Sequence, residues 1–152
     1  METSNPEIIV IDDEIELRDV IVRILNENQY PALPAASAEE GLALIERTQA
    51  PLVICDISMP KISGLELLAT VRKTGLPCSL VMLTAHDDRE RGMIALRLGA
   101  IDYVIKPVEI EALLLRVPLW LEISKRFQKV FLENRNAFKM LDLLRAKQGA
   151  QK

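Results

Sequence analysis

The sequence is poor in the residues that build zinc centres and disulfide scaffolds. Its 152 residues include a single histidine, His86, and two cysteines. Zinc sites combine closely spaced cysteine and histidine ligands, and no such Cys/His spacing exists here. Cys55 and Cys78 favour a reducing compartment. The strand assignment below places them at opposite ends of neighbouring strands, so we expect no disulfide.

Long apolar runs and a surplus of basic residues are also missing. No apolar run approaches the roughly 20 residues that a membrane-spanning helix needs. The first residues, Met1 to Ser4, lack the basic and apolar regions of a signal peptide. The net charge of −3 argues against a free-standing nucleic-acid binder. We therefore expect a cytoplasmic protein with no membrane insertion and no direct contact with nucleic acid.

The sequence does contain short apolar runs that alternate with longer segments of helical period, the pattern of a parallel α/β sheet. Ile8–Ile11, Leu52–Cys55 and Leu80–Leu83 are continuously apolar, as central strands covered on both faces should be. Ala32–Ala36 contains a proline and should form one edge of the sheet, with Tyr103–Ile105 at the other. These assignments predict a doubly wound sheet with strand order 2-1-3-4-5.

Helix signals separate the predicted strands. Ser37 followed by Glu40 is a capping box that predicts a helix over Ala38–Thr48. Asp87 with Glu90 predicts a second box, and Gly99 should end that helix in a left-handed conformation. The remaining helices are predicted around Leu17–Leu25, over Gly64–Lys73 and over Glu109–Val117.

Pro118 should kink or break the last of these helices, because proline removes a backbone donor and crowds the preceding turn. We therefore divide the chain into a domain of residues 1–117 and a helical extension of residues 118–152, with helix predicted to about Gln148.

The extension carries an apolar seam with alternating spacings of three and four residues, which is typical of a coiled coil. A parallel coil would place Asn134 at a core position, where asparagine fixes the register. Phe131 and Phe138 lie beside the seam and displace the charges that usually set pairing, so the extension could instead fold back onto the domain or join a wider bundle. We expect self-association, as a homodimer in at least one state, with orientation left open. The seam comprises Trp120, Ile123, Phe127, Val130, Asn134, Ala137, Leu141 and Leu144.

Five polar side chains follow or end the predicted strands: Asp12, Asp13, Asp56, Thr84 and Lys106. The carboxyl ends of parallel strands share one edge of the sheet, which is where such folds bind ligands. Carboxylates are suited to Mg²⁺, and the expected direct ligands are Asp13 and Asp56, with Asp12 holding a bound water. The lysine and the threonine could then contact a phosphoryl group carried by the nucleophile Asp56.

These residues and their neighbours resemble the receiver domain of two-component response regulators over residues 6–117. The resemblance implies a flavodoxin-like fold and a phosphoryl group accepted from a sensor histidine kinase or a phosphotransfer protein in a Mg²⁺-dependent reaction. The matching motifs are the acidic pair Asp12-Asp13, the segment Asp56-Ile57-Ser58-Met59-Pro60 with Gly64, the segment Leu83-Thr84-Ala85, and the run from Gly99 to Pro107.

The resemblance also implies individual roles. Asp56 would be the phosphoacceptor, and the main-chain carbonyl of Ser58 would complete the metal site formed with the acidic pair. Thr84 and Tyr103 would be the switch residues, and Lys106 would contact the phosphoryl group ahead of a cis Lys106–Pro107 bond.

Two other functions remain open. A Mg²⁺-dependent phosphohydrolase on a similar sheet usually has a second aspartate two residues after its nucleophile, and Ser58 holds that place here. A phosphorylation-independent interaction module would keep only the fold. We expect a regulator rather than an enzyme, acting on an unknown output protein or domain.

Overall fold

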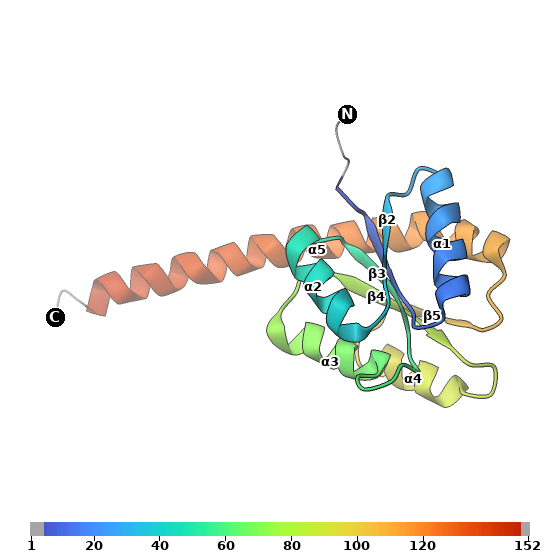
Figure 1. Cartoon of the computed structure of the whole chain (residues 1–152). Coiled ribbons are helices and arrows are strands. Elements are labelled where there is room, and N and C mark those ends of the chain that lie inside the picture. Colours follow the sequence, from blue (N-terminus) through green and yellow to red (C-terminus); the bar gives the residue numbers. More distant parts are fainter. Residues whose placement is uncertain (1–4, 150–152) are drawn as a thin grey trace.

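The structure is a computed structural model that describes residues 5–149 (Figure 1). Ten elements alternate along this part of the chain, five strands with five helices. The strands are β1 Ile8–Ile11, β2 Ala32–Ala35, β3 Leu52–Asp56, β4 Ser79–Thr84 and β5 Asp102–Ile105. The helices are α1 Ile15–Glu27, α2 Ala38–Thr48, α3 Gly64–Thr74, α4 Arg89–Arg97 and α5 Ile110–Gly149. In residues 5–149 no helix combines the length with the apolar character that crossing a bilayer requires.

The five strands form one parallel sheet in the order β2-β1-β3-β4-β5, as predicted. The register pairs Ile11 with Cys55 and Thr84 with Ile105, so the strands end close together at one edge of the sheet. Pro34 lies in the edge strand β2, where its missing backbone donor does not interrupt a central ladder.

The sheet is covered on both faces, because alternate residues of each strand point to opposite sides. Odd-numbered residues of β1 pack with α2, α3 and α4, whereas even-numbered ones pack with α1 and α5. All four side chains of β1 are fully buried, which explains its continuously apolar sequence. Cys55 and Cys78 are free and buried, so the expectation of no disulfide is confirmed.

The two helices with predicted capping boxes, α2 and α4, begin after a capping side chain, with one correction. Ser37 accepts a hydrogen bond from the Glu40 amide, and the Glu40 carboxylate accepts one from the Ala36 amide, as in the predicted capping box. The predicted cap at Asp87 is wrong. Asp88 caps α4 by accepting from the backbone of the third residue beyond it, because either of two adjacent acids can serve and only the backbone path selects one. Gly99 has the expected positive φ, at 106°.

The predicted break at Pro118 is wrong, because α5 runs without interruption across that residue. The first half of α5 packs on the sheet and buries one side of each turn, which holds the helix together on both sides of the proline. Trp120 and Leu121 belong to this buried side, and Ser124 at its end is also fully buried.

Further contacts fasten α5 at the opposite edge of the sheet from the predicted site. The Gln128 amide donates to the carbonyl oxygens of Gln49 and Pro77 at 2.8 and 3.0 Å. The Arg72 guanidinium lies 5.4 Å from the centre of the Phe127 ring, within range of a cation–π interaction. The extension therefore folds back onto the domain over its first half, one of the alternatives that the sequence left open.

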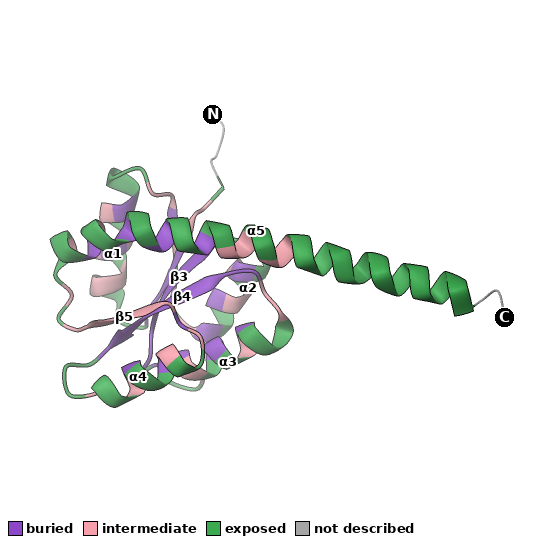
Figure 2. Cartoon of the chain, turned by 180° about the vertical axis from the view of Figure 1, so that it is seen from behind, coloured by how far each residue is buried: buried purple, intermediate pink, exposed green. Residues whose placement is uncertain are grey.

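Residues 133–149 of α5, called the arm from here on, extend beyond the domain (Figures 1 and 2). Every residue of the arm whose burial is described is exposed. The predicted seam is divided between two environments: Trp120 is buried against the domain, whereas Ile123 and Val130 lie 41% and 54% exposed. Residue spacing alone predicted one continuous seam, but part of that seam is buried against the domain.

Candidate functional site

Three carboxylates meet at the edge where the strands end. Asp12 follows β1, with its amide donating to the carbonyl of Ala35, and Asp56 is the last residue of β3. One oxygen from each of Asp12, Asp13 and Asp56 lies within 4.8 Å of the others. Asp12 and Asp56 are buried, whereas Asp13 is exposed, so the cluster opens to solvent on one side. The three acids that the sequence selected are thus brought together.

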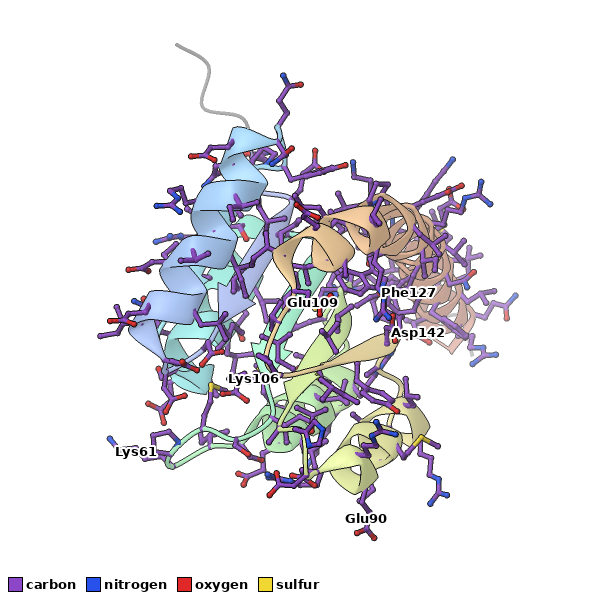
Figure 3. All side chains as sticks on the ribbon, turned by 90° about the vertical axis from the view of Figure 1, so that its right-hand side faces the viewer. Lys61, Glu90, Lys106, Glu109, Phe127 and Asp142 are labelled. Atoms are coloured by element: carbon purple, nitrogen blue, oxygen red, sulfur yellow. The ribbon has the colours of Figure 1, made fainter. Side chains whose placement is uncertain are left out.

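The ammonium group of Lys106 lies among these carboxylates (Figure 3). Its Nζ atom donates to Asp56 Oδ2 at 3.1 Å and lies 3.2 Å from Asp12 Oδ2. Glu14 Oε2 lies 3.5 Å away on the exposed side. Lys106 follows β5 and precedes a cis bond to Pro107, as predicted. The structure therefore brings the lysine to the aspartate, which the strand order alone could only suggest.

Burial and neighbouring charge perturb the proton equilibria of this cluster. Burial, followed by the charge of Asp12, raises the pKa of Asp56 to about 6, against the opposing effect of Lys106. Burial lowers the pKa of Lys106, but the carboxylates of Asp56 and Asp12 outweigh it and raise that pKa overall. Lys106 therefore stays charged at neutral pH and only partly offsets the repulsion between the acids.

The donor set fits a small divalent cation. The Asp12 Oδ2 atom is fully buried and, among residues 5–149, receives no well-aligned hydrogen bond, although Lys106 lies within ion-pair distance of it. Leaving such an oxygen without a partner is costly unless a cation or a water satisfies it. Mg²⁺ prefers a few carboxylate ligands together with retained waters, which an acidic cluster open on one side can supply. Asp12, Asp13 and Asp56 are the residues that would hold the ion.

The Thr84 hydroxyl is turned toward the loop that follows β4. Its Oγ1 atom donates to the carbonyl oxygen of Asp88 at 2.7 Å, and the residue is 1% exposed. Thr84 ends β4 beside the strand that carries Asp56. The hydroxyl thus stands at the predicted edge of the sheet but uses its proton to hold the start of α4.

The Tyr103 ring packs against α4 at a glycine. A β-carbon on Gly92 would lie 2.9 to 3.2 Å from three atoms of this ring, closer than carbon atoms normally approach. Tyr103 is half-buried and borders the core on the α2–α4 side of the sheet. The ring thus packs at a defined position on α4, and the residue remains partly exposed.

An arginine that the sequence did not single out joins the loops around the site. The Arg91 guanidinium donates to the Ser58 hydroxyl and to the carboxylate of Asp88. The Ser58 amide in turn donates to Asp56 Oδ1 at 3.1 Å. The only sequence signal was the three-residue spacing between Asp88 and Arg91, which is common on helix surfaces. The contact with Ser58, 33 residues away, could not be read from it.

Gly64 allows the loop after β3 to pack tightly against the backbone of Asp56. A β-carbon at this position would lie 2.2 Å from the carbonyl oxygen of Asp56 and 2.9 Å from the Cα of Ile57. Both are backbone atoms and cannot swing aside as a flexible side chain could. Glycine is therefore required by this close approach at the start of α3.

A second polar link connects β5 with α5. The Trp120 indole donates to Asp102 Oδ2 at 3.1 Å, and Asp102 Oδ1 accepts from the Tyr103 amide at 2.8 Å. Arg116 lies 3.5 Å from the same carboxylate. The residue next to Tyr103 is thereby tied to the buried part of α5. Sequence reasoning assigned Trp120 to the seam and missed this contact.

The site geometry agrees with comparisons to known proteins. Residues 8–118 match the response regulator receiver domain family. The response regulator MprA of Mycobacterium sp. (strain KMS) is 36% identical over 110 residues, covering 72% of this chain and 48% of that protein. The alkaline phosphatase synthesis transcriptional regulatory protein PhoP of Bacillus subtilis (strain 168) is 33% identical over 103 residues, covering 68% and 43%. The chain thus spans less than half of the length of these two relatives.

A solved structure shows the same fold. A response regulator receiver domain protein from Clostridium thermocellum superposes with a TM-score of 0.73 at 30% sequence identity, covering 79% of this chain and 97% of that one. The match with the family extends over most of the described domain and includes every strand of the sheet. From its sheet, its acidic edge and these likenesses together, the chain belongs to the response regulator receiver domain family.

Proposed function

We propose that this chain is a phosphorylation-controlled receiver in which Asp56 accepts a phosphoryl group from a histidine kinase or a phosphotransfer protein. The observation that carries the proposal is the position of Lys106 Nζ, 3.1 Å from Asp56 Oδ2 within a cluster of three carboxylates. An Asp56 oxygen attacks the phosphorus atom, an acyl phosphate forms, and the bond from phosphorus to the donor's imidazole nitrogen breaks. Positioning and charge neutralisation supply most of the catalysis of such a transfer.

The residues have separate tasks in this reaction. Asp56 is ionised at neutral pH, because its pKa of about 6 lies below that range, and is therefore a competent nucleophile. Lys106 neutralises a transferred oxygen. Bound Mg²⁺ would neutralise the clustered carboxylates and a further phosphoryl oxygen. The Ser58 amide holds Asp56 Oδ1, so Oδ2 would attack as Lys106 transfers its hydrogen bond from that oxygen to a phosphoryl oxygen.

The same geometry supports a switch at Thr84. Its hydroxyl would leave the Asp88 carbonyl and donate to the new phosphoryl group. A neutral hydrogen bond contributes about 1 kcal/mol and one to a charged group about 1.5–3 kcal/mol, so this exchange supplies roughly 0.5–2 kcal/mol. A change from 1:99 to 99:1 requires about 5.5 kcal/mol. The remainder must come from contacts such as those of Lys106 and the cation.

The switch would reach α5 through Tyr103 and Asp102. Movement of the Tyr103 ring on Gly92 displaces the backbone that also carries the acceptor of the Trp120 hydrogen bond. A shift of β5 is thus passed to the helix that ends in the arm. We propose that it changes self-association, and that a partner or a further domain produces the output, as the name of the relative PhoP suggests for transcription.

A phosphohydrolase is less well supported by the site. The residue two positions after Asp56 is Ser58, and its hydroxyl accepts a hydrogen bond from Arg91. A serine hydroxyl is too weak an acid to protonate a leaving group as a second aspartic acid would. The chain is therefore better suited to hold a phosphoryl group than to turn over phosphate esters.

The test is incubation with Mg²⁺ and a small acyl phosphate, followed by intact mass measurement. Wild type and Asp19→Asn, which alters an exposed carboxylate of α1, should gain one phosphoryl group, whereas Asp56→Asn should not. Chelation of Mg²⁺ should suppress the reaction. Modification of Asp56→Asn equal to that of wild type, or no modification of wild type, would reject the proposal.

A further inference from the structure

Figure 2 shows that the part of α5 beyond the domain consists of exposed residues, and several of these residues are apolar. Phe138 is 70% exposed, and Met140, Leu141 and Leu144 are each about half exposed. A groove of about 520 Å³ at the base of the arm is lined by Val130, Phe131 and Phe138, among others. A helix of this length has little stability of its own in water, so its apolar face calls for a partner.

The domain limits where such a partner can bind. Trp120 and Phe127 face the chain's own domain, so a coiled coil that uses the whole predicted seam cannot form without undocking α5. The seam is free from Val130 to about Gln148. This stretch of 19 residues, at about 1.5 Å each, gives roughly 28 Å for pairing.

We propose that the arm pairs in antiparallel orientation with the arm of a second copy of this chain, centred near Lys139. This inference rests on the self-association proposed above and adds its site and its direction. Asn134 then lies opposite Leu144 of the second copy, and Ala137 lies opposite its Leu141. Phe138 meets its own counterpart beside the two-fold axis. The apolar face of each arm is covered by the other.

Charge complementarity selects this direction. On one flank of the antiparallel pair, Glu133 lies beside Lys147 of the second copy, and symmetry repeats the contact. On the other flank, Arg135 can reach Asp142 of the second copy, again twice. The same alignment places Arg145 beside the half-buried Phe131 of the second copy, where a cation–π contact can form.

A parallel pair offers none of these contacts. In register, Glu133 would lie beside Phe138 of the second copy and Met140 beside its Arg145, so no opposite charges meet. Only Asn134, which would lie against its own counterpart, favours the parallel form. The antiparallel form places this amide near one end of the paired segment, where it can reach water.

The first test reverses the charges at Glu133 and Lys147 in the 152-residue protein. Dimer dissociation is measured by sedimentation with and without beryllofluoride, which mimics a phosphoryl group on Asp56. Glu133→Lys or Lys147→Glu alone should weaken the dimer roughly tenfold or more, because each creates two repulsive pairs. The double variant should return to within about threefold of wild type, because both pairs are restored in reverse. Ala146→Glu, at an exposed position of the arm that does not line the groove, is the control and should change dissociation little.

The second test determines the relative orientation of the two arms by crosslinking introduced cysteines. Burial raises the pKa of Cys55 well above its ordinary value and that of Cys78 to about 12, so neither native thiol competes. In a mixture of Glu133→Cys and Lys147→Cys, a short thiol-reactive linker should join unlike chains. Joining of like chains, an unrestored double variant, or a monomer in both states would overturn the inference. Phosphorylation of Asp56 is scored separately, so the proposed function can stand when this one fails.

Discussion

Replacing Asp56 with asparagine should make the metal-free protein more stable at neutral pH, although it removes the proposed phosphoacceptor. The folded protein buries this carboxylate beside Asp12, and its pKa is raised from 3.8 to about 6. A raised carboxyl pKa means that the folded state binds its proton more tightly than the unfolded chain. Ionisation of Asp56 therefore favours unfolding, and stability is lost as pH rises from about 4 to about 6.

The magnitude follows from the size of the shift. Each pKa unit corresponds to about 1.4 kcal/mol, so the shift of Asp56 corresponds to at most about 3 kcal/mol above pH 6. Asparagine keeps the shape of the side chain and carries no charge, but it weakens the hydrogen bond from Lys106. We expect a net gain of about 1–2 kcal/mol at about pH 7.5, falling toward zero near pH 4.

Urea unfolding in the presence of a chelator measures this directly. Trp120 is the only tryptophan and is 3% exposed, so its fluorescence should report loss of the domain. Wild type, Asp56→Asn and the control Asp19→Asn are compared at one protein concentration and at both pH values. Adding Mg²⁺ should reverse the order by stabilising wild type, by about 2.7 kcal/mol at one hundred times the dissociation constant.

The reasoning would be refuted if Asp56→Asn were no more stable than wild type at neutral pH without metal. A gain of the same size at both pH values would also refute it, because the gain would then not come from ionisation. Asp19→Asn should show neither the gain nor its pH dependence, since this carboxylate is 59% exposed.

Other substitutions test the surrounding structure. Gly64→Ala should destabilise the protein by about 1–3 kcal/mol in urea unfolding, because its β-carbon meets the backbone of the β3–α3 loop. Lys106→Met should slow phosphoryl acceptance at least about tenfold by intact mass, with Mg²⁺ binding retained, because one neutralising charge is lost. Pro118→Ala should raise stability by up to about 3 kcal/mol, since it restores a donor within α5, and unchanged unfolding would contradict this.

The sheet and the acidic edge could be predicted because their sequence signals are local. Ile8–Ile11 and Leu52–Cys55 are apolar without interruption, and a segment of helical period separates them. This pattern predicts parallel strands that are buried on both faces of the sheet. Parallel strands then bring Asp12 and Asp56 to one edge whatever the details of the loops. The topology also brings Lys106 to this edge, but β4 lies between its strand and β3, so the contact with both acids depends on the conformation of its side chain.

The α5 helix and the loop contacts could not be predicted in the same way. Spacing shows that Trp120 and Val130 lie on neighbouring faces of a helix, but it does not say which face the domain will cover. Pro118 was predicted to kink or break a helix that instead continues through this residue, because tertiary packing stabilises it on both sides. The hydrogen bond from Arg91 to Ser58 joins the first turn of α4 to the loop after β3, and the separation of these two segments depends on the whole fold, so no local pattern predicts it.

Gly92, which makes room for the Tyr103 ring, also weakens the helix that contains it. α4 has only nine residues, and a glycine inside a helix costs about 1 kcal/mol relative to alanine. A short helix with such a residue opens or shifts at low energetic cost, and hydrogen exchange should find its amides among the least protected in the domain. The proposed turn of the Tyr103 ring would therefore meet a helix that shifts easily, whereas an alanine at Gly92 would crowd the ring in its present position and oppose that movement.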